Sequence, residues 1–351
     1  MPAEVLVAPY LPLSQRTSVG PWELIPRAQL AAADVSEAWV LEQVQHLLNA
    51  YREQDRSSVA FGVVLRAHDA RVGDAIDRSK PPSLRRAFLA AVLESNPSAL
   101  TPESERTGNE GHARVTSDNV LVYGHPLRED GMVADEWGAM APRLVGGLRL
   151  GRPGVRFEGP GEIGIPARST HFDAEYASAV YAEFGKESDT SRRIARALDW
   201  LGIAWRNTTA LEPENRVIAL RIGFEALLGA GESTRALREA LSALIDPPDA
   251  PRTWRSWTER GTVQGPFELT DAEWWFQSFS LLRNHVMHGD ETPRAAWSHD
   301  GTNHVWIAED TLRKAIKETL IREGHSADLR RDHLERQIRR RITRPGESQA
   351  L

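Results

Sequence analysis

Three polar residues near position 285 have side chains that can take part in catalysis, and they lie at the end of an apolar segment. Arg283, Asn284 and His288 belong to the stretch LLRNHVMHG, which ends an otherwise apolar segment. A neutral histidine can take up or release a proton near neutral pH, because the unperturbed pKa of imidazole is about 6.5. An arginine stays charged and offers a fork of donors to anionic oxygens, while an asparagine can orient either partner without changing charge. The set favours proton transfer beside a bound anion.

The segment that carries this set has the start and stop signals of one long helix. Thr270 and Glu273 form a capping-box pattern at its start, and Gly289 supplies a C-terminal stop. Apolar residues surround most of its circumference, which predicts a helix at the buried centre of a bundle. An unpaired buried polar group costs about 1 to 3 kcal/mol, so polar residues at such a helix end need a compensating role. At about 100° per residue, Asn284 and His288 share a face that the Arg283 side chain can reach.

A structural role for these residues stays open. Arg283 could cap helix carbonyls or pair with Glu225, and His288 could be favoured by the helix dipole alone. His285 could be structural or could support the site. The spacing of His285 and His288 also suits a pair of metal ligands, but the sequence shows no third ligand, and we predict no metal site.

The chain as a whole divides into two parts of different pattern. Its 351 residues, 41% of them hydrophobic, favour two globular domains. A stretch dense in glycine and proline, 151–166, precedes almost purely helical patterning. We therefore predict an α+β protein, with a mixed α/β domain at 1–168 that senses a trigger or restrains activity, followed by an all-α helical bundle at 169–351.

Hydrophobic periodicity predicts the elements of both parts. In the first part, strands are expected at 5–11, 58–66 and 115–123, and helices at 37–51, 84–93 and, more weakly, 137–148. In the second part, residues 172–184 read as a connecting helix, and bundle helices follow at 189–205, 213–228, 237–244, 270–288 and 312–320. Asp189 is the expected N-cap of the first of these, and Pro213 is a first-turn residue of the second. Short connections favour antiparallel neighbours.

The helical half resembles the HEPN superfamily, and more narrowly its Apea-like branch. Members have a helical bundle with an Arg-polar-x-x-x-His signature near the end of a late helix, which matches Arg283, Asn284 and His288. A softer similarity joins 219–228, ALRIGFEALL, to the ALEALL-like helix that precedes the signature in that branch, although the first positions here depart from it. Glu225 in this stretch is a candidate supporting residue. The resemblance covers about 189–323 and leaves the N-terminal half outside.

The resemblance implies metal-independent RNA cleavage at a composite site formed by two signature helices in a homodimer. In such a site His288 would serve as general base or acid, Arg283 would hold the charge of the phosphate, and Asn284 would orient the histidine or the phosphate. Attack by the neighbouring hydroxyl would leave a 2′,3′-cyclic phosphate. The resemblance also implies a role in antiphage defence or a toxin-like stress response, with an accessory or antitoxin protein as a candidate partner. A catalytically silent HEPN scaffold is the alternative, and nucleotide binding or nucleotidyl transfer is a weaker third.

Composition and charge exclude several classes of protein. Since the chain has no cysteine, disulfide scaffolds, zinc ribbons and thiolate nucleophiles are excluded. A net charge of -6 does not indicate a large basic face, yet Arg339, Arg340 and Arg341 in the C-terminal tail form a candidate local RNA-binding surface. The same tail also fits a solvated helix. With neither a membrane-spanning run nor a signal-peptide pattern, we expect a cytoplasmic protein with no membrane association and no cofactor.

Overall fold

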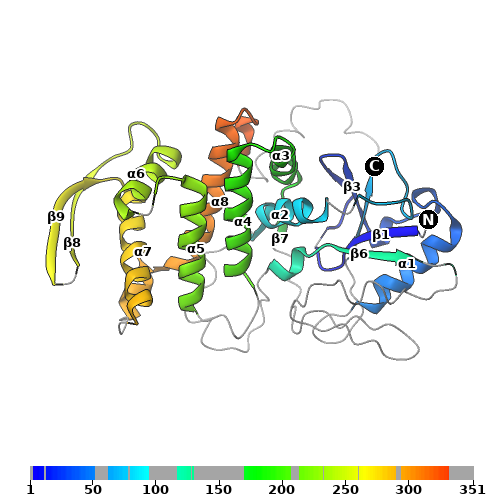
Figure 1. The fold of residues 1–351 in the computed structure, drawn as a ribbon, viewed down its shortest axis with the longest axis horizontal. Helices are drawn as coiled ribbons and strands as arrows, with labels where there is room; N and C mark the ends of the chain where they lie inside the picture. Colours follow the sequence, from blue (N-terminus) through cyan, green and yellow to red (C-terminus); the bar gives the residue numbers. More distant parts are fainter. Residues whose placement is uncertain are drawn as a thin grey trace, which may run out of the picture. The chain divides into compact units, whose positions relative to one another are not determined.

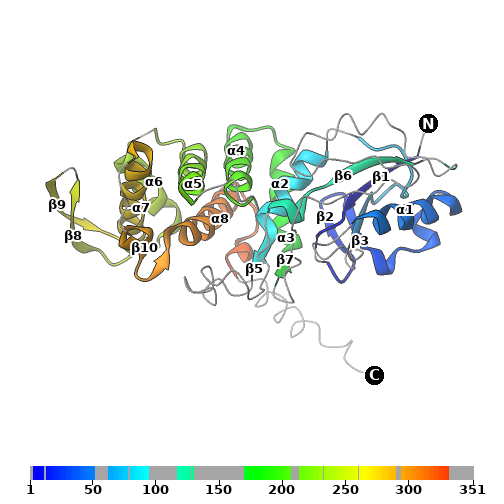
Figure 2. The same ribbon diagram turned by 90° about the horizontal axis from the view of Figure 1, so that it is seen from below.

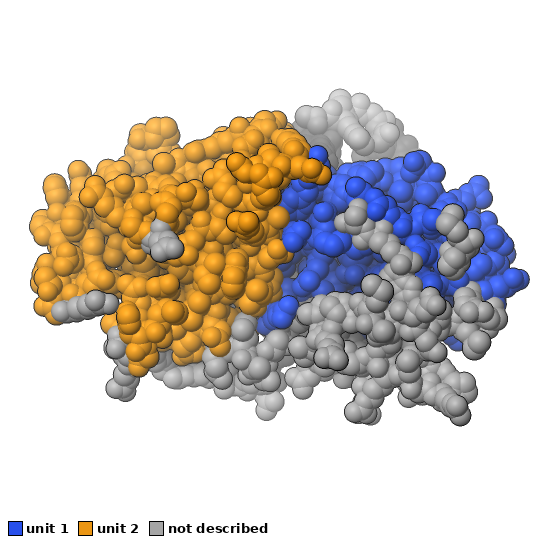
Figure 3. Space-filling model, in the orientation of Figure 1, with its two compact units in different colours: residues 1–185, 205–209 blue, residues 186–204, 210–351 orange. Residues whose placement is uncertain are grey.

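The computed structural model describes residues 3–11, 13–51, 62–77, 80–94, 117–127, 129, 170–206, 213–231, 233–259, 261–289 and 294–331. Helices and strands are mixed along this part of the chain, which confirms the α+β class (Figure 1). The chain forms two compact units, residues 1–185 with 205–209 and residues 186–204 with 210–351 (Figure 3). None of the helices in the described ranges combines the length and apolarity needed to cross a membrane.

The first unit contains a five-stranded antiparallel sheet in the order β2-β3-β4-β1-β6. The strands are β1 Ala3–Ala8, β2 Thr17–Val19, β3 Trp22–Pro26, β4 Val63–Ala67 and β6 Tyr123–Leu127. Helix α1, Ala38–Ala50, packs its apolar stripe against Val5, Val7 and Val64 of the sheet. Short 3-10 helices lie at Arg27–Gln29 and Ala32–Asp34. The alternating apolar residues of β1 and the helical spacing in α1 therefore meet in one core.

The predicted strand at 115–123 is wrong. The described part of that stretch begins with a 3-10 helix, Ser117–Val120, and the strand starts only at Tyr123. This stretch begins with Ser-Asp-Asn, and these residue types generally favour turns over strands because their short side chains can compete for backbone hydrogen bonds. The predicted helix at 137–148 and the first residues of the predicted strand at 58–66 lie outside the described residues.

Residues 170–185 belong to the first unit. Strand β7, Thr170–Phe172, pairs antiparallel with β5, Val92–Glu94, and α3, Ala174–Phe184, packs against α2, Pro81–Ala91. Asp173 caps α3 by accepting a hydrogen bond from the Tyr176 N–H at 3.1 Å. These pairings are long-range, so a compositional boundary could not reveal them, and the units divide at 185/186 where the sequence suggested 168/169.

The second unit is dominated by five long helices. They are α4 Asp189–Ala204, α5 Pro213–Leu228, α6 Thr234–Ile245, α7 Asp271–His288 and α8 His304–Arg322, with a 3-10 turn at Ala327–Arg330. Figures 1 and 2 show α4, α5 and α7 side by side. Pro213 begins α5 as predicted, whereas α4 is capped by the Ser188 hydroxyl, which accepts from the Ser191 N–H at 2.9 Å, and not by Asp189.

Gly223 allows α5 to approach its neighbours closely. A Cβ atom at this position would lie 3.0 Å from Leu312 Cδ2 on α8 and 3.6 Å from the Ala197 carbonyl oxygen on α4. The shorter distance is tighter than most real Cβ contacts, so a side chain at this position would require Leu312 to shift. The glycine that departs from the ALEALL-like pattern therefore has a packing reason.

The prediction of an all-α second half is wrong, because two β-hairpins interrupt the helices and the larger one precedes α7. Its strands are β8 Thr253–Glu259 and β9 Thr262–Leu269, and it projects from the helices (Figures 1 and 2). The strands carry Thr, Trp, Val and Phe, which favour extended backbone, and Gly261 adopts φ 77° in the turn. A smaller hairpin, β10 Ser298–His299 and β11 Thr302–Asn303, follows a 3-10 turn at Arg294–Trp297.

The capping box at the start of α7 is confirmed. Thr270 Oγ1 accepts from the Glu273 N–H at 3.1 Å, and Glu273 Oε2 accepts from the Thr270 N–H at 2.8 Å. The same Thr270 hydroxyl donates to Asp246 Oδ2 at 2.7 Å, which ties α7 to the end of α6.

Replacing Thr270 by alanine is expected to lower the free energy of unfolding by about 1 to 2 kcal/mol, because a capping acceptor and a buried hydrogen bond are both lost. Urea unfolding followed by fluorescence measures the change. Thr270→Ser keeps the hydroxyl and is expected to retain most of the stability. Equal stability of the alanine variant and the wild type would show that the cap contributes nothing.

Candidate functional site

Helix α7 carries the predicted residues at its C-terminal end. Its first turns bury Trp275, Phe276, Phe279 and Leu282 in the second unit, as expected for a central helix. Burial is lost over the last turn, where His285, Met287 and His288 are exposed, Met287 by 49%. Gly289 ends the helix with φ 68°, as predicted. The signature therefore lies where a buried helix reaches the surface.

Arg283 and Asn284 are brought together directly. Arg283 Nη1 donates to Asn284 Oδ1 at 3.3 Å, and both residues are half-buried. Arg283 Nε is buried and has no hydrogen-bond acceptor among the described residues. His288 lies one helical turn beyond Asn284, about 6 Å along the axis, on the exposed last turn. The guanidinium and the amide are thus positioned by packing, while the imidazole is presented to the surface.

A second arginine, which sequence reasoning did not select, lies beside this site. Arg221 on α5 is only 4% exposed, and its Nη1 lies 2.9 Å from Glu225 Oε1. Its guanidinium also stacks over the Phe276 ring of α7, 5.2 Å from the centroid. Burial lowers the pKa of Arg221 from its ordinary value; the Glu225 carboxylate opposes this shift, and the charge of Arg283 adds to it. Arg283 follows Phe276 by seven residues on α7, so the ring under Arg221 and Arg283 itself lie on the same face of that helix.

These contacts change the predicted role of Glu225. The sequence allowed Glu225 to pair with Arg283, but in the structure its ion pair is with Arg221, one turn earlier on the same helix. The signal that pointed to Arg221 was available: a charged residue interrupts the apolar face of α5 where the ALEALL-like pattern is broken.

The remaining predicted residues are His285 and three arginines of the C-terminal tail. His285 is on the exposed last turn with His288, so the structure places it near the surface of the site. Arg339, Arg340 and Arg341 lie outside the described residues. Within the described ranges, no three His, Asp or Glu side chains gather closely enough to hold a metal ion.

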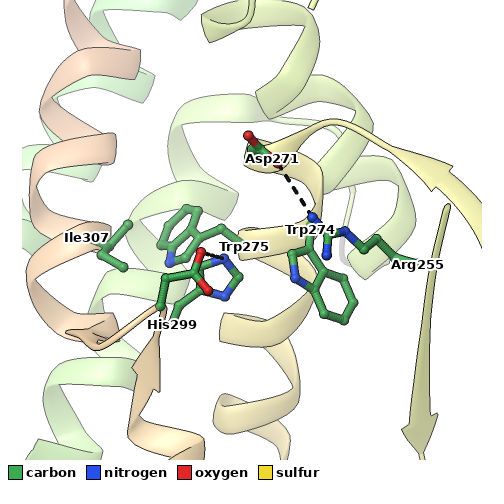
Figure 4. A pocket seen from close by; sticks show the side chains of 7 residues that line it. Arg255, Asp271, Trp274, Trp275, His299 and Ile307 are labelled. Carbon is green, nitrogen blue, oxygen red and sulfur yellow. Dashed lines mark ion pairs between the residues drawn. The ribbon is translucent and has the colours of Figure 1, made fainter. Parts of the chain in front are cut away.

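A pocket lies at the opposite end of α7. It has a volume of about 460 Å³ and is lined by Arg255, Asp271, Trp274, Trp275, His299, Asp300 and Ile307 (Figure 4). The Arg255 guanidinium lies 5.6 Å from the Trp274 ring centroid, and its Nη2 is 3.9 Å from Asp271 Oδ1. From Trp275 the helix rises about 12 Å to Arg283 and about 20 Å to His288, so this pocket is separate from the signature residues. The sequence predicted none of its lining residues as a site, because its walls depend on the unpredicted hairpins.

Comparison with protein-family models, with curated proteins and with solved structures found no match. A function for this chain is therefore inferred from its own residues and their geometry.

Proposed function

We propose that this protein is a metal-independent endoribonuclease of the HEPN type, with Arg283, Asn284 and His288 as its catalytic residues. The observation that supports the proposal most is the charge-bearing cluster at the end of α7, where the Arg283 guanidinium is held by packing and bonded to Asn284 beside the exposed turn of His288. A half-buried cation next to an accessible imidazole suits an anionic substrate whose reaction requires proton transfer.

The chemistry follows from these three side chains. His288 takes the proton of the ribose 2′-hydroxyl, and the 2′-oxygen attacks the neighbouring phosphorus. The bond from phosphorus to the 5′-oxygen breaks, and the leaving oxygen takes a proton from a second acid. The products are a 2′,3′-cyclic phosphate and a free 5′-hydroxyl. Arg283 stabilises the added negative charge on the phosphate, where preorganised donors contribute most.

A homodimer supplies the second acid in this proposal. Two copies of α7 that meet through their exposed last turns bring two His288 side chains to one phosphate, so that one acts as base and the other as acid. Met287 is 49% exposed on this turn and offers apolar surface for the contact. We propose that the N-terminal unit senses a trigger or restrains the nuclease, in a defence or toxin-like response that also involves an accessory or antitoxin protein.

The competing function is a catalytically silent scaffold that uses the same exposed turn for dimerisation. Incubation of the purified full chain with mixed RNA in EDTA separates the two. Cleavage that leaves 2′,3′-cyclic phosphate ends, identified by mass spectrometry, is the expected result. Cleavage that requires a divalent metal, or that leaves 3′-hydroxyl ends, would contradict this mechanism. A dimer that cleaves no RNA favours the scaffold.

A further inference from the structure

We infer that Arg221 and Arg283 together form a two-arginine anion site, in which Arg221 is a second ligand of the scissile phosphate. That the anion is an RNA phosphodiester rests on the proposed function. That an anion binds here does not, because it follows from the charge and hydrogen-bonding state of the two side chains.

The first argument is charge balance. Both guanidiniums are charged at neutral pH, and both lie along the same face of α7, because Arg221 covers Phe276 and Arg283 follows Phe276 by two helical turns. Glu225 is paired with Arg221, whereas Arg283 makes no ion pair with any described residue. Two cations with one carboxylate leave an excess positive charge beside the buried guanidinium of Arg221. Such an excess is costly unless an anion completes the cluster.

The second argument is hydrogen bonding. Nε of Arg221, Nη1 of Arg221 and Nε of Arg283 are all buried without a hydrogen-bond acceptor among the described residues. Arg221 Nη1 approaches Glu225 Oε1 at an ion-pair distance but without the angles of a hydrogen bond. Each buried donor left unpaired costs about 1 to 3 kcal/mol, so native structures keep few of them. A tetrahedral oxyanion has enough oxygens to satisfy several such donors at once.

The third argument is that Arg221 is already held in place. Its guanidinium lies over the buried Phe276 ring at 5.2 Å and beside Glu225, so its orientation is set by packing before any ligand arrives. The Glu225 side chain is 27% exposed and Arg283 is half-buried, which leaves a way in from the surface of the cluster. Glu225 thus holds Arg221 in the free protein and competes with an incoming anion for it.

The test uses a 2′-O-methyl RNA oligonucleotide, which cannot be cleaved because it lacks the attacking hydroxyl. For Arg221→Met, the slope of log affinity against log salt concentration should fall by about one, since one phosphate contact is lost. Arg221→Lys should retain the slope but bind more weakly, because lysine lacks the fork. Glu225→Gln should bind more tightly, since the competing carboxylate is gone. Arg235→Met, at an arginine 81% exposed on α6, is the matched control and should match the wild type.

Cleavage of ordinary RNA gives a second readout that a purely structural role would not change. For folded Arg221→Met we expect kcat to fall roughly 10²- to 10³-fold, as when one oxyanion donor is removed. If Arg221→Met does not fold, the other two variants still test the inference, because Arg221→Lys should weaken RNA binding and Glu225→Gln should strengthen it. Unchanged salt slope, affinity and kcat in all three folded variants would overturn the inference.

The inference and the proposed function fail in different ways. RNA cleavage that depends on Arg283 but not on Arg221 would support the nuclease function and contradict the two-arginine site. In a second outcome, no RNA is cleaved, but inorganic phosphate raises the melting temperature of the wild type and not of Arg221→Met. This result would support the anion site and contradict the nuclease function.

Discussion

Alanine at Arg283 or His288 is expected to lower kcat/KM for RNA cleavage by roughly 10²- to 10⁴-fold, the range for loss of a general acid or base or of an oxyanion donor. The two residues act on the same transition state, so the double variant should lose little more than the more damaging single variant. Arg283→Lys keeps the charge but cannot donate through two parallel N–H groups, and an intermediate loss is expected. Initial rates on one defined RNA, measured in EDTA, give these ratios.

The matched control for this series is His285→Gln. His285 lies on the same exposed last turn of α7 as His288, so the substitution tests surface change without removing the proposed acid or base. We expect a loss well below that of His288→Ala. Circular dichroism and thermal unfolding must show that each variant remains folded. Wild-type rates in folded Arg283→Ala and His288→Ala variants would exclude these residues from the site.

The free energy of unfolding is expected to fall as pH decreases from about 6.5 to about 4, with buried histidines as the cause. Burial lowers the pKa of His304 to about 4, with His299 adding to the effect, and burial lowers the pKa of His125 to about 4 as well. In the unfolded chain both imidazoles take up protons near pH 6.5, whereas in the folded protein they stay neutral. The unfolded state binds more protons across this pH range. Acidification therefore lowers the free energy of unfolding by up to about 3 kcal/mol per histidine.

The surroundings of the two histidines explain the neutral form. His125 Nε2 lies 2.7 Å from the Tyr51 hydroxyl, whose own pKa burial raises well above its ordinary value, so a protonated hydroxyl shares a hydrogen bond with a neutral ring. His304 is 2% exposed, and its ring lies 6.1 Å from Phe279 and 5.9 Å from His299. The two histidines belong to different units, and we expect both units to lose stability in acid.

Urea unfolding at several pH values between 7 and 4 measures this effect. His304→Gln and His125→Gln, which do not titrate, should each flatten the dependence on pH, although both are expected to be less stable at pH 7. His68→Gln is the control, because His68 is exposed. A wild-type free energy of unfolding that stays constant from pH 6.5 to 4 would contradict the neutral state of both rings.

Local signals in the sequence determined much of the second unit. The start of α7 follows from Thr270 and Glu273, and its end follows from Gly289, because caps act within one turn of the helix they terminate. Pro213 and the apolar spacing of α5 located that helix equally well. The sequence also allowed the hydrogen bond between Arg283 and Asn284, since the two residues are adjacent in the chain.

Contacts between distant segments were decided only by the tertiary structure. Periodicity shows that a helix has an apolar face but not which helix covers it, so the position of Arg221 over Phe276 could not be inferred from either segment alone. The same holds for β7, whose partner β5 is far away in the sequence, and for the walls of the pocket around Trp274. Spacing along one helix therefore selected Arg283, Asn284 and His288 as candidates. The packing of α5 on α7 placed a second arginine, Arg221, against that helix, because burial and charge depend on every element that meets at a point.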